Sequence, residues 1–279
     1  MAKNGSLVAV RITVTPIILN NEVIGAILDF ADITKEKEID RAKTEFASLA
    51  SHQLRTPLSS LSLASELLFP EIKGKLDKEQ NKYLRIIDDS VKEMIVLTEE
   101  LLNISRIEMG TLAVTPEPTN LNSFLDDLLK NFSIQISSKK LELIKNFDEN
   151  IPKINIDQKL FRQVVDNLIS NAIKYNKNNG KIEVSVKTNK DDIVICVSDS
   201  GYGIPKHQHS QIFKKFFRSD NVLKSETKGT GLGLYIVKSL VEQYGGQISF
   251  ESEENKGSAF CFTVPLEGMK PKTGKIWGS

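Results

Sequence analysis

The sequence predicts an α+β protein, in which an antiparallel helical hairpin is followed by an α/β two-layer sandwich. Two long segments with apolar residues at heptad spacing predict the hairpin. Helical segments mixed with pairs of alternating apolar runs, from residue 121 to residue 265, predict the sandwich. The chain of 279 residues has room for about two domains, each with a core of its own.

Composition argues against several functional classes. Lys and Arg number 37 against 36 Asp and Glu, so the net charge of +1 gives no overall basic field for nucleic acid or an anionic membrane. No apolar run reaches the ~18 residues of a spanning helix, and no signal peptide opens the chain. We therefore expect a cytoplasmic chain without a membrane segment; a membrane anchor of the full-length protein would belong to a part upstream of residue 1. Cys196 and Cys261 lie in separate β-like runs without metal-ligand spacing, and we expect both to be reduced core residues.

The first 34 residues have the pattern of a β-hairpin. Two alternating apolar runs flank Asn20-Asn21. Two strands do not make an independently stable sheet, so the segment must pair with further residues or pack on a neighbour. It resembles the last strands of a PAS sensor domain, whose exit signal is similar to Asp32-Ile33-Thr34. Residues 1–34 are therefore expected to be the C-terminal remnant of a PAS-like domain, and residues 35–45 a linker helix.

Two long helical patterns follow, separated by a break that contains Pro and Gly. The first pattern, up to residue 68, repeats Leu54, Leu61 and Leu68 every seven residues. The heptad positions of the second are Leu84, Ile87, Val91, Met94, Thr98 and Leu101. Because one hairpin cannot surround both stripes, we expect a homodimer in which two copies form a four-helix bundle.

From Leu121 onwards, helical and strand patterns alternate. We expect helices at residues 121–139, 158–175 and 232–244, and strands at 141–147, 181–188, 192–198, 247–252 and 258–265. The strands are expected to form antiparallel pairs. The Lys-, Gly- and Pro-rich residues 268–279 are expected to be a disordered tail.

A histidine on the first helix is the leading candidate for catalysis. At about 100° per residue, His52 lies about 160° from Leu54, so we expect it to be exposed, with Thr56 on the same outer face. An isolated exposed histidine is usually only a solvated side chain. The eight residues from Ser51 to Leu58, Ser-His-Gln-Leu-Arg-Thr-Pro-Leu, however, resemble the phosphoacceptor box of sensor histidine kinases. The resemblance implies that His52 is a nucleophile that takes the γ-phosphoryl group of ATP and passes it to an aspartate of a response regulator receiver domain. An imidazole with a pKa of about 6.5 is a competent nucleophile near pH 7.

Gln53 departs from this family, which usually has a carboxylate directly after the histidine. Because an amide is not a general base, either autophosphorylation is slower, by the ~10²–10⁴-fold that a general base supplies, or water or the other imidazole nitrogen relays the proton. Thr56 matches the family position implicated in dephosphorylating the partner. A capping or solvent-facing hydroxyl is the alternative for Thr56.

Four further segments carry residues suited to a nucleotide. Asn167–Tyr175 places polar side chains on one helical face, with an amide oxygen for Mg²⁺ and a lysine for phosphate. Asp199–Pro205 ends a strand with a carboxylate and glycines. Gly229–Leu234 leads into a helix whose N-terminal amides favour phosphate, although the loop fits neither the Rossmann nor the P-loop pattern. Ile212–Arg218, with the polar residues up to Lys228, is predicted to be a mobile lid.

In this order, the four segments resemble the ATP-binding domain shared by histidine kinases and gyrase-type ATPases. The resemblance implies ATP and Mg²⁺ as ligands, with Asn171 on Mg²⁺ and Asp199 on adenine. It implies an ATP site made of Asn167, Asn171, Lys174, Tyr175, Asp199, Gly201, Gly203, Ile204, Arg218, Gly229, Thr230, Gly231, Leu232, Gly233 and Leu234. Lys174, Tyr175 and Arg218 would face phosphates or ribose. By the same resemblance, residues 46–112 are the dimerisation and histidine phosphotransfer hairpin and residues 120–267 the ATP-binding catalytic domain. His207 and His209 have no partner at ligand spacing and are expected in a solvated loop.

Two other functions stay open. Gln53 together with Thr56 is also compatible with a phosphatase-biased sensor that acts on the phosphorylated regulator. The ATP site alone would fit a non-kinase clamp or a nucleotide-binding scaffold, but that function leaves the residues around His52 unexplained.

Overall fold

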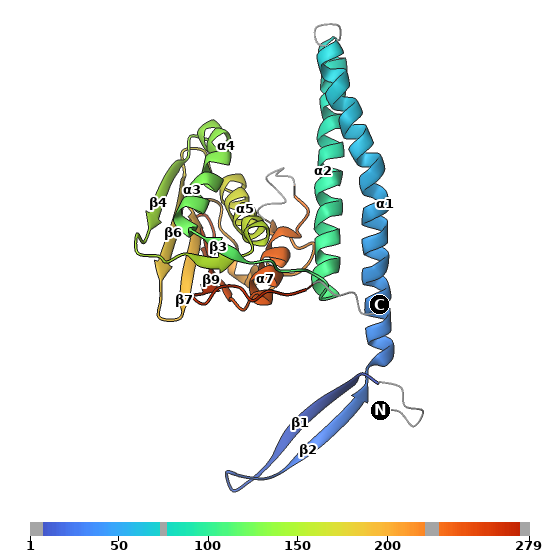
Figure 1. Cartoon of the computed structure of the whole chain (residues 1–279), viewed down its shortest axis with the longest axis vertical. Coiled ribbons are helices and arrows are strands. Elements are labelled where there is room, and N and C mark those ends of the chain that lie inside the picture. The colour runs from blue at the N-terminus through green and yellow to red at the C-terminus, as the bar shows by residue number, and fades with distance from the viewer. Residues whose placement is uncertain (1–7, 73–76, 221–228, 274–279) are drawn as a thin grey trace. The chain divides into compact units, whose positions relative to one another are not determined.

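A computed structural model of the chain describes residues 8–72, 77–220 and 229–273. The chain divides into two compact units, Met1–Met109 and Gly110–Ser279 (Figure 1). The first is a β-hairpin followed by two helices, and the second is a sheet with helices, which is the expected α+β class.

The β-hairpin consists of β1 (Val10–Leu19) and β2 (Glu22–Asp32), which pair antiparallel. Asn20 and Asn21 have φ values of 52° and 66°, the left-handed conformation that a two-residue hairpin turn requires. Nearly every residue of both strands is exposed. The hairpin is joined to the following helix by Ala9 N–H, which donates to Thr34 Oγ1 at 3.1 Å, and by an Arg11–Glu36 ion pair at 2.9 Å.

The helical hairpin consists of α1 (Thr34–Ile72) and α2 (Lys78–Glu108), which run antiparallel (Figure 1). Asp77 caps α2, because its carboxylate accepts from the backbone N–H groups of Glu79 and Gln80, both at 2.8 Å. The Gln80 side chain in turn accepts from the Asp77 N–H, which completes a capping box.

Among the described members of the predicted heptad stripes, only Val91 and Thr98 of α2 are buried within one chain. Ser51 and Leu58, at other positions of α1, are also buried. Other stripe members are exposed: Leu54 52%, Leu61 52%, Ile87 53% and Met94 43%. The side chain of Leu68 lies outside the described residues. The exposure of Leu54 and Leu61 in one chain agrees with the expectation that a single hairpin cannot surround both stripes.

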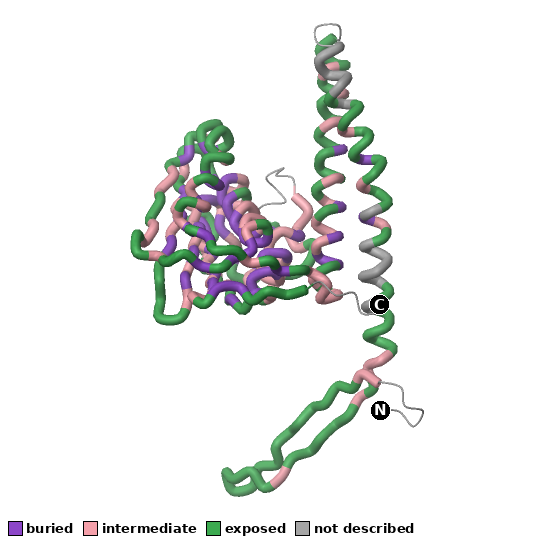
Figure 2. Tube along the Cα trace, viewed as in Figure 1, coloured by how far each residue is buried: buried purple, intermediate pink, exposed green. Residues whose placement is uncertain are grey.

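The second unit is built on a mixed five-stranded sheet with the order β4-β6-β7-β9-β8. Its strands are β4 (Glu142–Phe147), β6 (Lys181–Thr188), β7 (Asp192–Asp199), β8 (Ile248–Glu253) and β9 (Gly257–Pro265). β4 and β6 pair parallel, which differs from the expected antiparallel pairs, and the other neighbours pair antiparallel. Burial alternates along β6, β7 and β9, so one face of the sheet forms the core (Figure 2).

Helices cover that face of the sheet (Figure 1). They are α3 (Leu121–Asn131), α4 (Ser133–Ser138), α5 (Gln158–Lys174) and α7 (Gly233–Gln243). The single helix predicted for residues 121–139 is divided at Phe132, whose φ and ψ of −93° and 0° are not helical. The core includes Phe161 of α5, which contacts Phe262 of β9 with ring centroids 5.8 Å apart.

A second, small sheet pairs β3 (Glu117–Thr119) with β5 (Ile154–Ile156), two strands too short to be predicted from the sequence. The chain returns to this region after β9. Met269 is 3% exposed, and its N–H donates to Asn155 O at 2.7 Å. The prediction of a disordered tail at residues 268–279 therefore does not hold for residues 268–273, because buried Met269 packs against the rest of the unit. Residues 274–279 lie outside the described part of the chain.

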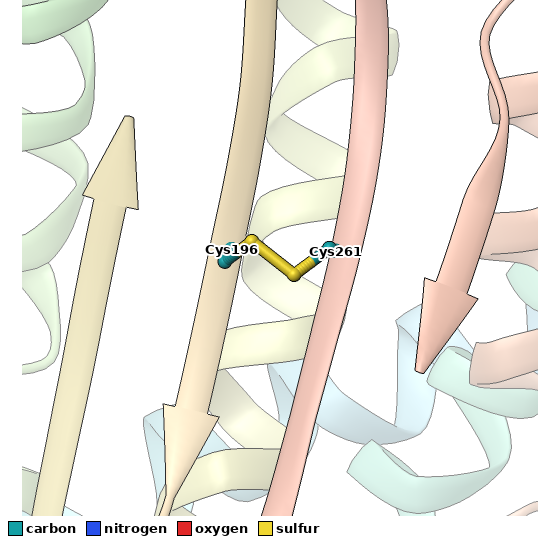
Figure 3. The surroundings of a disulfide bond; sticks show 2 residues. All are labelled: Cys196 and Cys261. Atoms are coloured by element: carbon teal, nitrogen blue, oxygen red, sulfur yellow. A yellow bond between two sulfur atoms is a disulfide. The ribbon is translucent and has the colours of Figure 1, made fainter. Parts of the chain in front are cut away.

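Cys196 of β7 and Cys261 of β9 form a disulfide, so the prediction of two reduced cysteines was wrong (Figure 3). The two residues are direct partners in the β7–β9 register, with Cα atoms 4.1 Å apart. Both alternate with buried residues and therefore point away from the helix-covered face. Nothing in the sequence brings together two cysteines that are 65 positions apart; only the strand register does.

Within the described residues, no helix is both long enough and apolar enough to cross a membrane.

Candidate functional site

The phosphoacceptor candidate lies on α1. The backbone of His52 is helical, but its side chain lies outside the described residues, so the expected exposure of His52 stays a prediction. Gln53 and Thr56 are both exposed. The Thr56 carbonyl accepts from Ser60 Oγ at 3.1 Å, and α1 continues through this region to Ile72.

The polar face of α5 is the base of the nucleotide-site candidate. Asp157 caps this helix by accepting from the backbone N–H groups of Lys159 and Leu160 at 3.0 and 3.2 Å. The buried face of α5 consists of Leu160, Phe161, Val164, Val165, Leu168, Ile169, Ala172 and Ile173. Since that face is fixed against the sheet, the half-buried Asn167, Asn171 and Lys174 share the remaining, polar face.

The glycine-rich loop reaches this polar face. A Cβ atom at Gly233 would lie 2.6 Å from Asn167 Oδ1, and one at Gly229 would collide with Lys174 Nζ. Gly231 has a φ of 74°, and a Cβ there would lie 2.7 Å from the Phe216 carbonyl carbon. Gly231 needs glycine because its φ is positive and the backbone at Phe216 approaches it, whereas Gly229 and Gly233 approach ends of side chains of α5.

The loop ends in a buried anchor at the start of α7. Leu232 is fully buried, and its N–H donates to Thr230 Oγ1 at 3.2 Å. Leu234 is half-buried in the first turn of α7. The structure thus brings the first and third predicted segments together.

Asp199 ends β7 in a largely buried position. Its Oδ1 accepts from Gly201 N–H at 2.8 Å, and the backbone N–H of Ser258 also donates to the carboxylate. Burial raises the pKa of Asp199 to about 6, although these two hydrogen bonds lower it in part. An ionised carboxylate can accept about four hydrogen bonds, and Asp199 receives two from backbone N–H groups. Its remaining acceptor positions are suited to a hydrogen-bond donor of a ligand.

The loop after Asp199 is attached to the end of α5. Tyr202 N–H donates to Tyr175 O at 3.1 Å, and a Cβ at Gly201 would collide with that same oxygen. Gly203 has a φ of 61°, and Ile204 N–H donates to Ser252 Oγ at 2.8 Å. The second predicted segment therefore joins the first.

Tyr175 connects this region with Arg218. Burial raises the pKa of the Tyr175 hydroxyl, and the positive charge of Arg218 partly offsets that increase. Lys174 Nζ lies 5.1 Å from the Tyr175 ring centroid. Two cationic side chains therefore lie near one aromatic ring at the end of α5.

The beginning of the predicted lid is anchored to the sheet. Ile212 is buried, the Phe213 ring lies 5.8 Å from that of Phe250, and Ser219 Oγ donates to Gln208 Oε1 at 2.6 Å. The remainder of the predicted lid, residues 221–228, lies outside the described residues.

The two histidines near the lid differ. His207 is exposed, as expected. The prediction of a solvated loop was wrong for His209, which is half-buried, with Nε2 3.0 Å from Ile204 O and its ring 5.1 Å from that of Phe250. Strand β8 supplies the aromatic partner, which the sequence around His209 does not reveal.

Three polar residues beside the site are not among the site residues predicted from the sequence, although one of them lies within the predicted segment Asp199–Pro205. Lys139, Asn176 and Ser200 connect α4, the end of α5 and the Asp199 loop by hydrogen bonds. Their only signal in the sequence is their position at the ends of predicted elements.

Comparisons with known proteins identify both parts of the chain. The family of the His Kinase A (phospho-acceptor) domain matches residues 42–110, and the family described as histidine kinase-, DNA gyrase B-, and HSP90-like ATPase matches residues 156–268. Among curated proteins, the circadian input-output histidine kinase CikA of Synechococcus elongatus is 31% identical over 261 residues, which cover 91% of this chain and 35% of CikA. Sensor histidine kinase WalK of Bacillus subtilis is 31% identical over 252 residues, which cover 89% of this chain and 41% of WalK.

Solved structures agree on the fold. Full-length ShkA in complex with AMPPNP has a TM-score of 0.68 at 24% identity, over 82% of this chain and 47% of that one. Histidine kinase ThkA in complex with the response regulator protein TrrA has a TM-score of 0.58 at 23% identity, over 91% of this chain and 74% of that one. The chain spans about two fifths or less of the length of the curated relatives named above. With a phosphoacceptor domain followed by the matching ATPase domain, the chain belongs to the sensor histidine kinases.

Proposed function

We propose that this chain is the kinase core of a two-component sensor, which uses ATP to phosphorylate His52 and then transfers the phosphoryl group to an aspartate of a response regulator. The observation that carries the proposal is the convergence of three separate segments on one site. The loop at Gly229–Leu234 and the Asp199 loop each contact α5 or its C-terminal end, in the unit that matches the ATPase family.

The roles within the ATP site follow from the chemistry of each group. Asp199 would accept a hydrogen bond from the adenine amino group, and Lys174 and Arg218 would neutralise phosphate charge. The backbone of the glycine-rich loop can approach phosphates closely because it lacks side chains there, and α7 begins at Gly233. The other proposed lining residues are Asn167, Tyr175, Gly201, Gly203, Ile204, Gly229, Thr230, Gly231, Leu232 and Leu234.

Asn171 is the proposed Mg²⁺ ligand. The described residues contain no group of three or more His, Cys, Asp or Glu side chains that could hold a metal ion. An amide oxygen beside Lys174 nevertheless fits Mg²⁺, which takes few protein ligands and completes its shell with water and phosphate oxygens. When bound, Mg²⁺ would neutralise charge on the triphosphate.

Phosphoryl transfer would form a bond between an imidazole nitrogen of His52 and the γ-phosphorus, while the bond from that phosphorus to the ADP oxygen breaks. The imidazole proton must then leave. Gln53 cannot accept it as a carboxylate would, so water or the second ring nitrogen would relay it. Thr56, exposed one turn from His52, is proposed to orient water when the phosphorylated regulator is hydrolysed.

The proposed assembly is a homodimer. Leu54, Leu61, Ile87 and Met94 are apolar and each is exposed by 43% or more in a single chain. Packing of two hairpins into a four-helix bundle would bury them. The proposal of a response regulator as partner is supported by ThkA, a histidine kinase of the same fold, whose solved structure is a complex with the response regulator protein TrrA.

The proposed domain division places the dimerisation and phosphotransfer hairpin at residues 46–112 and the ATP-binding domain at residues 120–267. Residues 35–45 would be a linker helix, here continuous with the rest of α1. Residues 1–34 are proposed to be the end of a PAS-like sensor domain, supported by a hairpin whose apolar residues are exposed.

The test is incubation of the chain with γ-labelled ATP and Mg²⁺, with His52→Gln as the matched variant. We expect label on the wild type that is labile in acid and stable in alkali, as a phosphoramidate is, and none on the variant. ATP binding without any label on the wild type would contradict kinase activity. Equal labelling of both proteins would contradict His52 as the acceptor.

A further inference from the structure

We propose that Lys139 is a positioning residue for nucleotide binding, which holds the Lys174–Tyr175 end of α5 in place through hydrogen bonds to backbone carbonyls. The inference rests on the ATP site proposed above. It concerns a residue that lies outside all four predicted segments and is not proposed to touch ATP.

The ammonium group of Lys139 is bound at the C-terminal end of α5. Its Nζ donates to Ile173 O at 2.9 Å, to Lys174 O at 2.9 Å and to Asn176 O at 3.3 Å. A lysine has three N–H donors, so these three carbonyls use all of them. The last carbonyls of a helix have no partner inside the helix, and a cation there also interacts favourably with the helix dipole.

Lys139 is itself fixed in position. It caps α4, and its carbonyl accepts from Asn179 N–H at 3.0 Å. Its side chain is half-buried, and this burial lowers the pKa of the ammonium group. A partly desolvated ammonium bound by three carbonyls is a rigid connection between α4 and α5, unlike a lysine on the open surface.

A second connection runs from this helix end to the Asp199 loop. Asn176 is 2% exposed, and its Nδ2 donates to Lys181 O at 2.8 Å. Ser200 Oγ donates to Asn176 Oδ1 at 3.3 Å and accepts from Lys181 N–H at 2.8 Å. The carbonyl of Asn176 is one of the three that Lys139 binds. The same few residues therefore set the position of the helix end and of the residue next to Asp199.

The consequence for the site is geometric. These hydrogen bonds connect the Lys174–Tyr175 end of α5 with the residue next to Asp199. Lys174 is proposed to bind the phosphate end of the nucleotide and Asp199 the adenine end. Loss of the ammonium group would let the helix end shift relative to Asp199, and displacements of about 1 Å can reduce function ~10²-fold. We expect a weaker effect on binding alone, of ~10-fold.

The experiment compares ATP affinity in the full chain and three variants. Lys139→Met should raise the Kd for ATP by ~10-fold, and Lys139→Arg should recover part of the loss because it keeps a cationic donor. Lys145→Met is the matched control: Lys145 pairs with Asp126 at 2.6 Å on the surface and makes no described bond to α5. The control should bind ATP like the wild type.

A spectroscopic measurement separates positioning from simple destabilisation. The amide signal of Tyr202, whose N–H donates to Tyr175 O at 3.1 Å, should shift in folded Lys139→Met and return toward the wild-type value in Lys139→Arg. If Lys139→Met does not fold, Ser200→Ala, which breaks the bond to Asn176, should give the same shift and a weaker affinity for ATP. Wild-type affinity in a folded Lys139→Met or in Ser200→Ala would overturn the inference while leaving the ATP site intact. Failure of the wild type to bind ATP would instead overturn the proposed function.

Discussion

Asp199→Asn should make the protein more stable at neutral pH while weakening its affinity for ATP. Burial raises the pKa of Asp199 from 3.8 to about 6 in the folded chain. At pH values between 3.8 and about 6, the Asp199 carboxyl group is mostly protonated in the folded state and mostly ionised in the unfolded state. The contribution of Asp199 to the free energy of unfolding is therefore fully present below pH 3.8 and is lost as the pH rises through about 6.

The difference between 3.8 and about 6 corresponds to about 3 kcal/mol of free energy of unfolding lost at neutral pH. Of this, about 1.4 kcal/mol is lost between pH 5 and pH 7.5. Asparagine carries no charge, so the variant avoids this loss. It keeps one acceptor oxygen for the N–H groups of Gly201 and Ser258, and losing the second hydrogen bond costs about 1 kcal/mol. The net gain at pH 7.5 is about 2 kcal/mol.

The assay is the rate of amide hydrogen exchange in β7 at pH 5 and pH 7.5, because this rate reports the stability of the unit Gly110–Ser279 separately from the helical hairpin. Asp192→Asn, at the other end of the same strand, is the control. If Asp199→Asn is no more stable than the wild type at pH 7.5, or if both variants change the pH dependence equally, the burial argument is wrong. Higher stability with unchanged ATP affinity would instead contradict the proposed adenine contact.

Three further predictions concern other parts of the chain. Cys261→Ser should lower the free energy of unfolding of the oxidised protein by up to about 4 kcal/mol, because the disulfide closes a 65-residue separation. The prediction would be contradicted if a reducing agent left the denaturation midpoint of the wild type unchanged. Gln53→Glu should raise the initial autophosphorylation rate by ~10²-fold, whereas Gln53→Leu should not, because only glutamate supplies a general base. Equal rates for the two variants would show that the imidazole proton of His52 does not leave through residue 53. Leu61→Glu should convert the proposed dimer to monomers in analytical ultracentrifugation, because it places a charge in the proposed interface. Leu63→Glu, on a different face of α1, should not.

Local patterns in the sequence were enough to predict most helices and strands of the second unit. Periodicity alone gives β6 at residues 181–188 and α5 to within one residue at its end, because burial on one face repeats every two residues in a strand and about every 3.6 in a helix. The segments around His52, Asn171, Asp199 and Gly231 could likewise be recognised, because each is a short contiguous motif.

Other features depend on residues that are far apart in the sequence, and only the tertiary structure decided them. The parallel pairing of β4 with β6, the Cys196–Cys261 disulfide and the attachment of Met269 all follow from strand register and chain return. The bonds from Lys139 to the end of α5 are of the same kind. The sequence determined the local elements and the motifs, because both depend on neighbouring residues. The structure decided which motifs share a site and what holds them there, because long-range contacts leave no periodic signal in the sequence.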